Sequence, residues 1–310
     1  MTQAIELRAG LFLIDLHFQG ESGVIAAFLL ENAGEYALVE TGPTSTLDAL
    51  LEGIQAAGVA PEAITKLLVT HIHLDHAGAA GTLVKLFPHL QVYVHEVGAP
   101  HLADPSKLLA SAQRIYGDRM DALWGEVLAV PSANIVALSD RDSVRIGHAE
   151  LTALYTPGHA SHHVAYLDAE QRQVFTGDVA AIRLQGFDYV RPATPPPDID
   201  LELWTASLDL LRGVHADTLH LTHFGSFSDV NRHLMTAQDQ LFAWATFIEN
   251  LQDQGREPLE IKSALRDRAD AEVLAVRPDK EAVWRYELAA PSGMSVDGYL
   301  RYLRRRDRDH

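Results

Sequence analysis

The chain has 310 residues, of which 47% are hydrophobic and 22% are charged, the balance of a globular protein with a sizeable core. It contains 25 lysines and arginines against 42 aspartates and glutamates, and the formal net charge of −17 argues against nucleic acid and anionic membrane surfaces as partners. The absence of cysteine excludes disulfides, thiolate nucleophiles and sulfur ligands to a metal.

Residues 1–20 lack the basic stretch, long apolar region and small-residue cleavage site of a signal peptide. No apolar run reaches the roughly 18–20 residues that span a bilayer. We therefore expect a cytoplasmic protein without a membrane partner.

Residues 10–96 alternate between strand and helix patterns. Short apolar runs bounded by glycine or turn residues predict strands at 10–18, 23–31, 36–45, 64–71 and 90–96. The spacing of leucines predicts a helix at 45–58, and a second helix is expected at 77–88, where a proline ends it. This alternation is typical of an α/β layered fold.

The remaining chain changes character twice. Residues 98–130 contain helical runs and few β-branched residues, which predicts a helical insertion. Strand patterns return at 134–140, 143–147, 149–159, 162–168, 173–181 and 218–225. A helix is expected at 200–213, and from 230 onward helices at 230–252 and 258–275 precede a tail. We expect this helical part to pack on the core or on a partner subunit, which leaves a homodimer open.

The stretch "VTHIHLDHAG", residues 69–78, places His71, His73, Asp75 and His76 directly after an apolar run. Four such side chains repel one another when charged alike, and buried unpaired charge is costly. Imidazole and carboxylate are ligands that suit zinc, iron and manganese. Since alternate strand residues share a face, His71 and His73 project to one side, while Asp75 and His76 follow from the turn. The cluster therefore predicts a metal site with room for two ions.

Three further ligand-type residues follow later strands at strand-to-loop junctions, where α/β sheets carry their sites. His159 follows a Pro-Gly turn, Asp178 follows a Thr-Gly turn, and His223 precedes Phe-Gly. Alone, each histidine is more often a hydrogen-bonded structural residue, and Asp178 is an ordinary turn residue. Together with the cluster they supply enough ligands for two metals.

The motif "HIHLDH" resembles the HxHxDH signature of the metallo-β-lactamase superfamily, and His159, Asp178 and His223 follow in the order that this superfamily uses. "LVETGP" is similar to its early Asp-Thr-Gly motif, with Glu40 in place of an aspartate that supports the ligands. The phrases "GDVAAIRL", "PATPPPDIDLELW" and "LTHFG" resemble a bacterial and archaeal subgroup of metal-dependent hydrolases.

The resemblance covers residues 10–230 and implies an αβ/βα four-layer sandwich, with two mixed sheets face to face, helices outside and metals at one sheet edge. We expect a catalytic domain at 1–230, with a helical insertion at about 98–130, and a helical C-terminal extension at 231–310. The resemblance also implies ligands: His71, His73 and His159 for the first metal, Asp75, His76 and His223 for the second, and Asp178 as a bridge.

Two divalent ions ~3.5–4 Å apart can share a water and lower its pKa toward ~7. We therefore expect a metal-dependent hydrolase in which a hydroxide activated by two metals attacks a small ester-type substrate: a lactone, thioester, carboxylic ester or phosphoester. Zinc is the expected metal, with iron or manganese as alternatives. Asp75 is also the candidate catalytic residue, as a proton shuttle.

The loop at 17–23, the insertion and the loop at 186–197 are expected to form the walls around the metals. His162 and Tyr189 are candidates either for a hydrogen bond to substrate or for a structural role. His95 is expected beside the ligands or on the surface. We expect His163 and His220 to be structural.

Two other functions compete with hydrolysis. An iron-dependent oxygenase or other redox enzyme can use the same ligands, although a flavodiiron reductase would need a flavin domain that the C-terminal part is too short to supply. A metal-stabilised binding protein without turnover is the second. A secreted β-lactamase and a nuclease are disfavoured by the missing secretion signal and by the charge.

Overall fold

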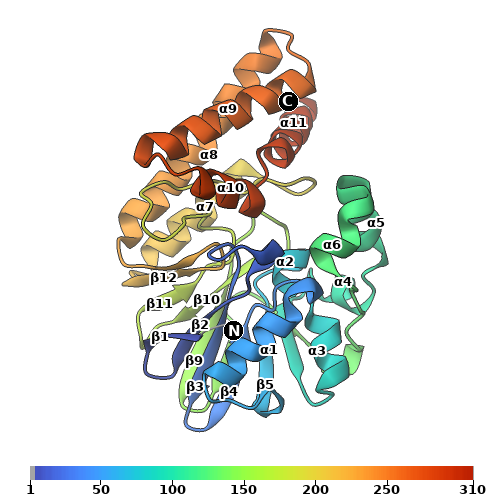
Figure 1. Cartoon of the computed structure of the whole chain (residues 1–310), viewed down its shortest axis with the longest axis vertical. Helices are drawn as coiled ribbons and strands as arrows, with labels where there is room; N and C mark the ends of the chain where they lie inside the picture. Colours follow the sequence, from blue (N-terminus) through green and yellow to red (C-terminus); the bar gives the residue numbers. More distant parts are fainter. Residues whose placement is uncertain (1–3, 310) are drawn as a thin grey trace.

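The structure, a computed structural model, describes residues 4–309 (Figure 1). Its strands are β1 (Ala4–Arg8), β2 (Leu11–Asp15), β3 (Ala26–Asn32), β4 (Glu35–Val39), β5 (Ile64–Leu68), β6 (Gln91–His95), β7 (Ile135–Leu138), β8 (Ser143–Ile146), β9 (Ala149–Tyr155), β10 (Val164–Asp168), β11 (Gln173–Phe175), β12 (Thr218–Leu221) and β13 (Gly225–Phe227). Its α-helices are α1 (Leu47–Ala56), α2 (Leu74–Ala77), α3 (Ala80–Leu86), α4 (Ala99–Ala103), α5 (Ser106–Tyr116), α6 (Met120–Trp124), α7 (Leu201–Gly213), α8 (Val230–Asp253), α9 (Pro258–Val276), α10 (Lys280–Ala289) and α11 (Ser292–Asp309).

The strands form two mixed sheets, in the orders β1-β2-β3-β4-β5-β6-β7 and β13-β12-β11-β10-β9-β8. In the first sheet β1 to β4 pair antiparallel, whereas β4 to β7 pair parallel. In the second sheet only β11 and β12 pair parallel. In the second sheet β9, β11 and β12 therefore run in the same direction, and their carboxyl ends lie at the same edge of that sheet.

The sheets pack face to face because the central strands bury both of their faces. In β3, Phe28 belongs to the cluster between the sheets and Leu29 to the cluster under the outer helices, as the side-chain period of two requires. Helices α1 and α3 cover the outer face of the first sheet, and α7 and α8 cover the second. The αβ/βα four-layer sandwich expected from the resemblance is confirmed, with its helical insertion as α4–α6 and its helical extension.

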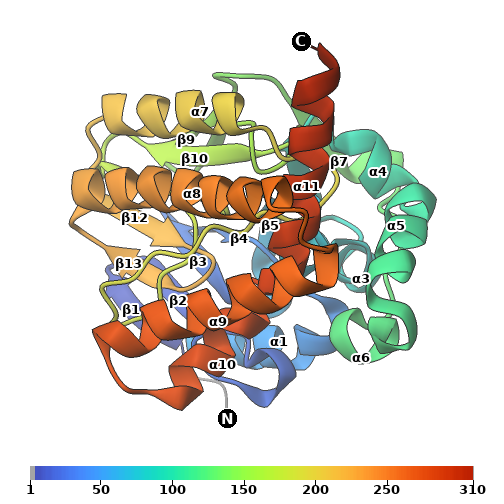
Figure 2. The ribbon, with the colours of Figure 1, turned by 90° about the horizontal axis from the view of Figure 1, so that it is seen from above.

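The C-terminal helices extend beyond the sandwich. Helices α8, α9 and α11 contact one another, and Figure 1 shows α9–α11 above the end of the sandwich at which α2 lies. Figure 2 shows the same helices lying across that end when the molecule is viewed from above. The division of the chain at residue 230 stays a prediction.

Several elements differ from the sequence expectation. The helix expected at 77–88 is divided into α2 and α3, and β1, β13, α10 and α11 were not expected as separate elements. Strand β1 was not expected, and it pairs antiparallel with β2 at the edge of the first sheet, where its half-exposed side chains give little hydrophobic signal. The expected tail after 275 is instead two regular helices, α10 and α11. Asp279 caps α10 by accepting a hydrogen bond from the Ala282 amide.

Between residues 4 and 309, no helix has the length and apolar character needed to cross a bilayer.

Candidate metal centre

The structure brings all seven candidate ligands to one edge of the sandwich, each just beyond the end of a strand. The segment that follows β5 carries His71 and His73 and leads into α2, which carries Asp75 and His76. The other three follow later strands: His159 comes after β9, Asp178 after β11 and His223 after β12. Since strands of both sheets end here, side chains up to 152 residues apart in the sequence share one site.

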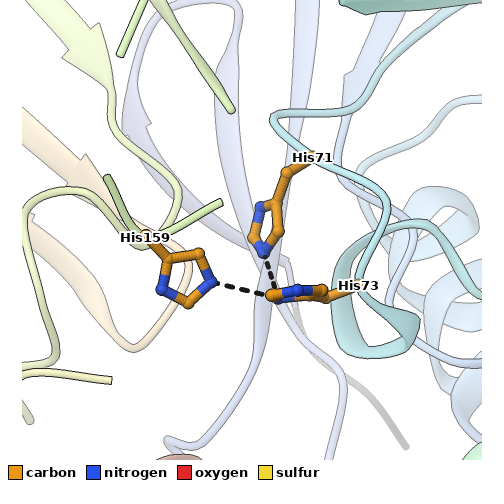
Figure 3. Close-up of side chains that lie close together, drawn as sticks. All are labelled: His71, His73 and His159. Atoms are coloured by element: carbon orange, nitrogen blue, oxygen red, sulfur yellow. Dashed lines mark hydrogen bonds between the residues drawn. The ribbon is translucent and has the colours of Figure 1, made fainter. Parts of the chain in front are cut away.

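Three imidazoles form the first group (Figure 3). Nδ1 of His73 lies 2.9 Å from Nε2 of His71 and 3.0 Å from Nε2 of His159. The far nitrogen of His159 lies 2.8 Å from the Ala193 carbonyl oxygen, which can only accept, so Nδ1 carries the proton. The lone pair on Nε2 of His159 therefore points at His73.

The protonation of this group favours a bound cation. Burial, reinforced by neighbouring histidines, holds the pKa of His71 well below its usual range. Burial and the His159 ring lower the pKa of His73 to about 4, and burial also lowers the pKa of His159. At neutral pH the three rings are uncharged, and at most one proton can lie between three converging nitrogens. Neutral imidazole is the form that binds metals.

Asp75, His76 and His223 form the second group. Oδ2 of Asp75 lies 3.8 Å from Nε2 of His76 and 3.5 Å from Nε2 of His223. Nδ1 of His223 donates to the Val24 carbonyl oxygen at 2.7 Å, and Nδ1 of His76 lies 3.0 Å from the Glu40 carboxylate. Both rings thus turn Nε2 toward Asp75, and the carbonyl and the carboxylate behind them fix this orientation.

Asp178 lies between the two groups and faces each with a different oxygen. Oδ2 is 3.4 Å from Nε2 of His159 in the first group. Oδ1 is 3.2 Å from Nε2 of His76 and 3.6 Å from Nε2 of His223 in the second. Two metal ions, one in each group, would therefore find one carboxylate oxygen apiece on the same side chain.

The charges around the second group are unbalanced without cations. Glu40, Asp75 and Asp178 bring three carboxylates into a buried site. Although burial lowers the pKa of His76, the Asp178, Asp75 and Glu40 carboxylates outweigh it and raise that pKa well above its usual range. Burial raises the pKa of Asp75, but His76 and His223 outweigh this and lower it to about 2. The site is built for positive charge.

Buried ligand atoms that lack a hydrogen-bond partner indicate whether these residues fit a metal. Among the described residues, Nε2 of His76, Oδ1 of Asp178 and Nε2 of His223 are buried without a hydrogen-bond partner. Leaving three buried atoms without a hydrogen bond is costly, and these three face one another at 3.2 and 3.6 Å, as atoms that could share a cation do. The two divalent ions expected from the sequence fit this donor set of imidazole nitrogens and carboxylate oxygens.

Glu40 supports the cluster from behind. Its carboxylate accepts hydrogen bonds from the Thr70 hydroxyl at 2.5 Å and from the Thr222 hydroxyl at 3.3 Å, and it lies beside Nδ1 of His76. The Thr70 hydroxyl also lies 3.0 Å from Nδ1 of His71. One fully buried glutamate, standing where the resemblance places an aspartate, therefore supports both groups.

A cavity of about 750 Å³ opens above the ligands, within the size range of small-molecule sites. Its floor contains His73, Asp75, Asp178 and His223. The three expected wall segments all reach it, through Phe18, through side chains of α5 and α6, and through residues 193–197. The Asp15 carboxylate holds the loop of Phe18 in place by accepting hydrogen bonds from Ser22 and the Gly23 amide.

The other histidine and tyrosine candidates lie outside the lining of this cavity. The His162 ring packs behind the ligands, with its centroid 6.2 Å from that of His71. The Tyr189 hydroxyl donates to the Glu272 carboxylate at 2.8 Å, which favours the structural alternative. His95 stacks on Tyr155 at 4.3 Å, away from the ligands.

The two histidines expected to be structural make buried hydrogen bonds. His163 accepts a hydrogen bond from the Asp178 amide at 3.1 Å and so helps to place the carboxylate that lies between the two groups. His220 is held between Ser226 and Gln173.

The sequence did not reveal that the C-terminal helices line the cavity. Trp284 and Leu288 of α10 and Met294 of α11 form the wall opposite the insertion. An amphipathic helix that faces a cavity has the same sequence pattern as one that packs on a core, so no signal distinguished them.

A model of the metallo-β-lactamase superfamily matches residues 21–223, the span that contains every candidate ligand. The chain belongs to this superfamily. Solved structures of the family have the same fold: a metallo-β-lactamase family protein from Thermus thermophilus superposes with a TM-score of 0.73 over 97% of this chain and 95% of that one, at 23% identity. That similarity shows the fold alone.

Two sequence relatives narrow the comparison. A metallo-β-lactamase fold-containing protein of Sulfurisphaera tokodaii is 29% identical over 46% of this chain and 53% of its own length. A protein of Aspergillus chevalieri named atrochrysone carboxyl ACP thioesterase is 26% identical over 57% of this chain and 44% of its own length. The chain thus matches about half the length, or less, of these curated relatives.

Proposed function

We propose that the protein is a metal-dependent hydrolase that holds two divalent metal ions and acts on a small ester-type substrate. The observation that carries the proposal is the position of Asp178, whose two oxygens face two separate groups of ligand atoms at 3.2–3.6 Å. A structural carboxylate would be satisfied by hydrogen-bond donors, whereas Oδ1 of Asp178 has no such partner among the described residues.

When bound, two divalent ions would supply a nucleophile at neutral pH by lowering the pKa of a shared water. His71, His73 and His159 would hold the first ion, Asp75, His76 and His223 the second, and Asp178 would contact both. Zinc suits this donor set, and iron and manganese accept it as well.

Asp75 has the further role of moving a proton. Its side chain is 22% exposed, whereas the His76 and His223 rings beside it are buried. Its carboxylate lies at the floor of the cavity, within reach of water and of a bound substrate. Asp75 can therefore accept a proton from the nucleophile and return it to the leaving group.

Of the four ester-type substrates, the thioester has the most support. The relative from Aspergillus chevalieri is named as a thioesterase, and its match covers more than half of this chain. A cavity of about 750 Å³ also leaves room for an extended acyl group above the metals. We therefore place thioesters ahead of lactones, carboxylic esters and phosphoesters.

The Asp178→Ala variant tests the proposal. We expect the wild type to contain about two metals per chain and the variant to lose both, together with more than about 100-fold of kcat/KM. Elemental analysis for zinc, iron and manganese, with assays against a panel of the four substrate classes, measures both effects. Asp217→Ala, which removes an exposed carboxylate paired with Arg172, is the matched control.

The same measurements distinguish the competing functions. Full activity and full metal content in Asp178→Ala would refute the bridging role. Iron in the wild type, with turnover that requires oxygen, would favour the oxygenase instead. Bound metal without turnover of any panel substrate would favour a binding protein.

A further inference from the structure

The cavity walls carry four cationic side chains in a chain whose formal net charge is −17. Arg114 and Arg119 stand on the insertion side, and Lys262 and Arg266 of α9 stand on the opposite side. The lining also contains four carboxylates, those of Asp75, Asp178, Glu287 and Asp297, so only cations without a carboxylate partner can attract an anionic ligand there.

Two of these cations are already neutralised. Lys262 pairs with Asp297 at 2.7 Å, and Arg266 pairs with Glu287 at 3.0 Å and with Asp270 at 2.9 Å. Arg114 and Arg119, by contrast, have no carboxylate partner within 4.0 Å in the part of the chain that the structure describes. Both are exposed, so their charge is available at the mouth of the cavity.

The same wall is apolar further in. Trp124 of α6 stacks on Phe18 with ring centroids 5.6 Å apart and meets the edge of Tyr116 at 5.0 Å. Phe18 and Trp124 are buried, and Ile115 lies beside Arg114 at 36% exposure. The lining of one cavity thus combines candidate metal ligands, this aromatic cluster and the two arginines.

We propose that this cavity binds an acyl thioester of a phosphopantetheine carrier, with the acyl group against Phe18, Tyr116 and Trp124 and the carrier phosphate at Arg114 and Arg119. The inference rests on the proposed function, because the thioester carbonyl must lie over the metal ligands. Apolar surface recognises the acyl chain, and guanidinium groups are the side chains best suited to a phosphate.

The reaction is a hydrolysis that balances without a further reactant. Water adds across the acyl carbon–sulfur bond: a carbon–oxygen bond forms, the carbon–sulfur bond breaks, and the departing thiolate takes up a proton. The products are a carboxylic acid and the carrier with a free thiol, and the carrier leaves when the arginines release its phosphate.

The test measures hydrolysis by the metal-loaded full chain of thioesters whose carriers either have or lack a phosphate. One acyl group is presented on pantetheine, on 4′-phosphopantetheine, on coenzyme A and on acyl carrier protein. We expect kcat/KM to be higher on each phosphate-bearing carrier than on pantetheine. In Arg114→Gln/Arg119→Gln this preference should fall about tenfold at low ionic strength.

The control is Arg141→Gln/Arg145→Gln, which removes two exposed arginines that do not line the cavity and should keep the wild-type preference. The wild type supplies a second measurement: raising the salt concentration should raise KM for acyl coenzyme A and leave KM for acyl pantetheine nearly constant. A higher rate on acyl carrier protein than on coenzyme A would identify the protein-bound carrier as the source of the phosphate.

The outcomes separate this inference from the proposed function. Equal turnover on pantetheine and phosphopantetheine, or an unchanged preference in the arginine variant, would overturn the phosphate site while leaving the hydrolase intact. Hydrolysis of lactones or esters but of no thioester would do the same. A metal-loaded protein that hydrolyses none of the four substrate classes would overturn the proposed function itself.

Discussion

The floor and the walls of the cavity are built in opposite ways. The floor consists of side chains that follow strand ends. Among the candidate ligands in and below it, His76, His159 and His223 are almost fully buried and held by hydrogen bonds from behind. The walls come from helices of the insertion and the C-terminal part, and they include half-exposed residues such as Trp284 at 49%. The floor fixes the positions of the candidate ligand atoms, whereas the walls present a surface to whatever enters the cavity.

We expect this difference to divide the work of the site, with metal binding and catalysis at the floor and the choice of substrate at the walls. Ligand atoms must be held within a few tenths of an ångström, which rigid strand ends and supporting hydrogen bonds provide. The wall helices α5, α6 and α9–α11 carry none of the seven candidate ligands, so we expect their residues to change without disturbing the centre. We therefore expect variants of the floor to lose metal and variants of the walls to keep it.

Among variants that leave all seven candidate ligands in place, the largest effect is expected from Glu40→Gln. An amide would place a donor where Thr70, Thr222 and Nδ1 of His76 now meet an acceptor, and it would remove one of the buried negative charges. Losing such support behind a ligand typically costs 10–100-fold in metal affinity, and we expect a value of about 100-fold for the second ion. Metal titration monitored by calorimetry measures it.

Glu40→Asp is the control for that prediction. It keeps the carboxylate, and aspartate tolerates the backbone of residue 40, whose φ is +67°. Metal affinity within about tenfold of the wild type is expected. If Glu40→Gln bound both metals as tightly as the wild type, the floor would not depend on its buried support.

The next effect concerns the attachment of the wall. Arg191 is fully buried among Tyr189, Trp244 and Tyr286, and its guanidinium lies 3.4 Å from the Glu287 carboxylate of α10. In Glu287→Gln that charge would stay buried without its partner. We expect the free energy of unfolding to fall by about 2 kcal/mol, below the range for fully buried pairs because Glu287 is partly exposed and Arg191 keeps its aromatic neighbours.

Urea unfolding with metal analysis checks this expectation. Glu281→Gln, an exposed site on the same helix, should leave the unfolding midpoint unchanged. Metal content near the wild-type value is expected in both variants. Metal lost from Glu287→Gln before unfolding would show that floor and wall are coupled.

The floor could be predicted from the sequence because histidine and aspartate are recognisable as possible metal ligands by residue type alone. Four ligand-type residues within six positions, and three more at later strand ends, have no equally good structural explanation. The structure brings all seven together, although their roles as ligands stay a prediction. The alternation of strands and helices predicted an α/β layered fold, and the resemblance of the HIHLDH motif to the superfamily implied the four-layer sandwich.

The wall could not be predicted to the same extent. The insertion was recognised as helical, but Phe18, Tyr116 and Trp124 meet only in the folded chain. Helix α10 reaches the cavity through Trp284 and Leu288, whose i, i+4 spacing is that of any amphipathic helix face. An apolar residue in the sequence predicts that its side chain is buried, but it does not indicate whether a core, a neighbouring helix or a ligand covers it.

The smallest effect is expected from Trp124→Leu, which removes the centre of the aromatic wall. Its ring contacts Phe18 and Tyr116, and aromatic pairs of this kind contribute about 0.5–1.5 kcal/mol each. We expect KM for an apolar acyl substrate to rise about fivefold, with metal content and kcat near the wild-type values. Trp284→Leu makes the same change on the opposite, half-exposed wall and should raise KM less. An equal loss of kcat in both variants, or metal loss from Trp124→Leu, would contradict the division between a floor that binds metal and walls that bind the acyl group.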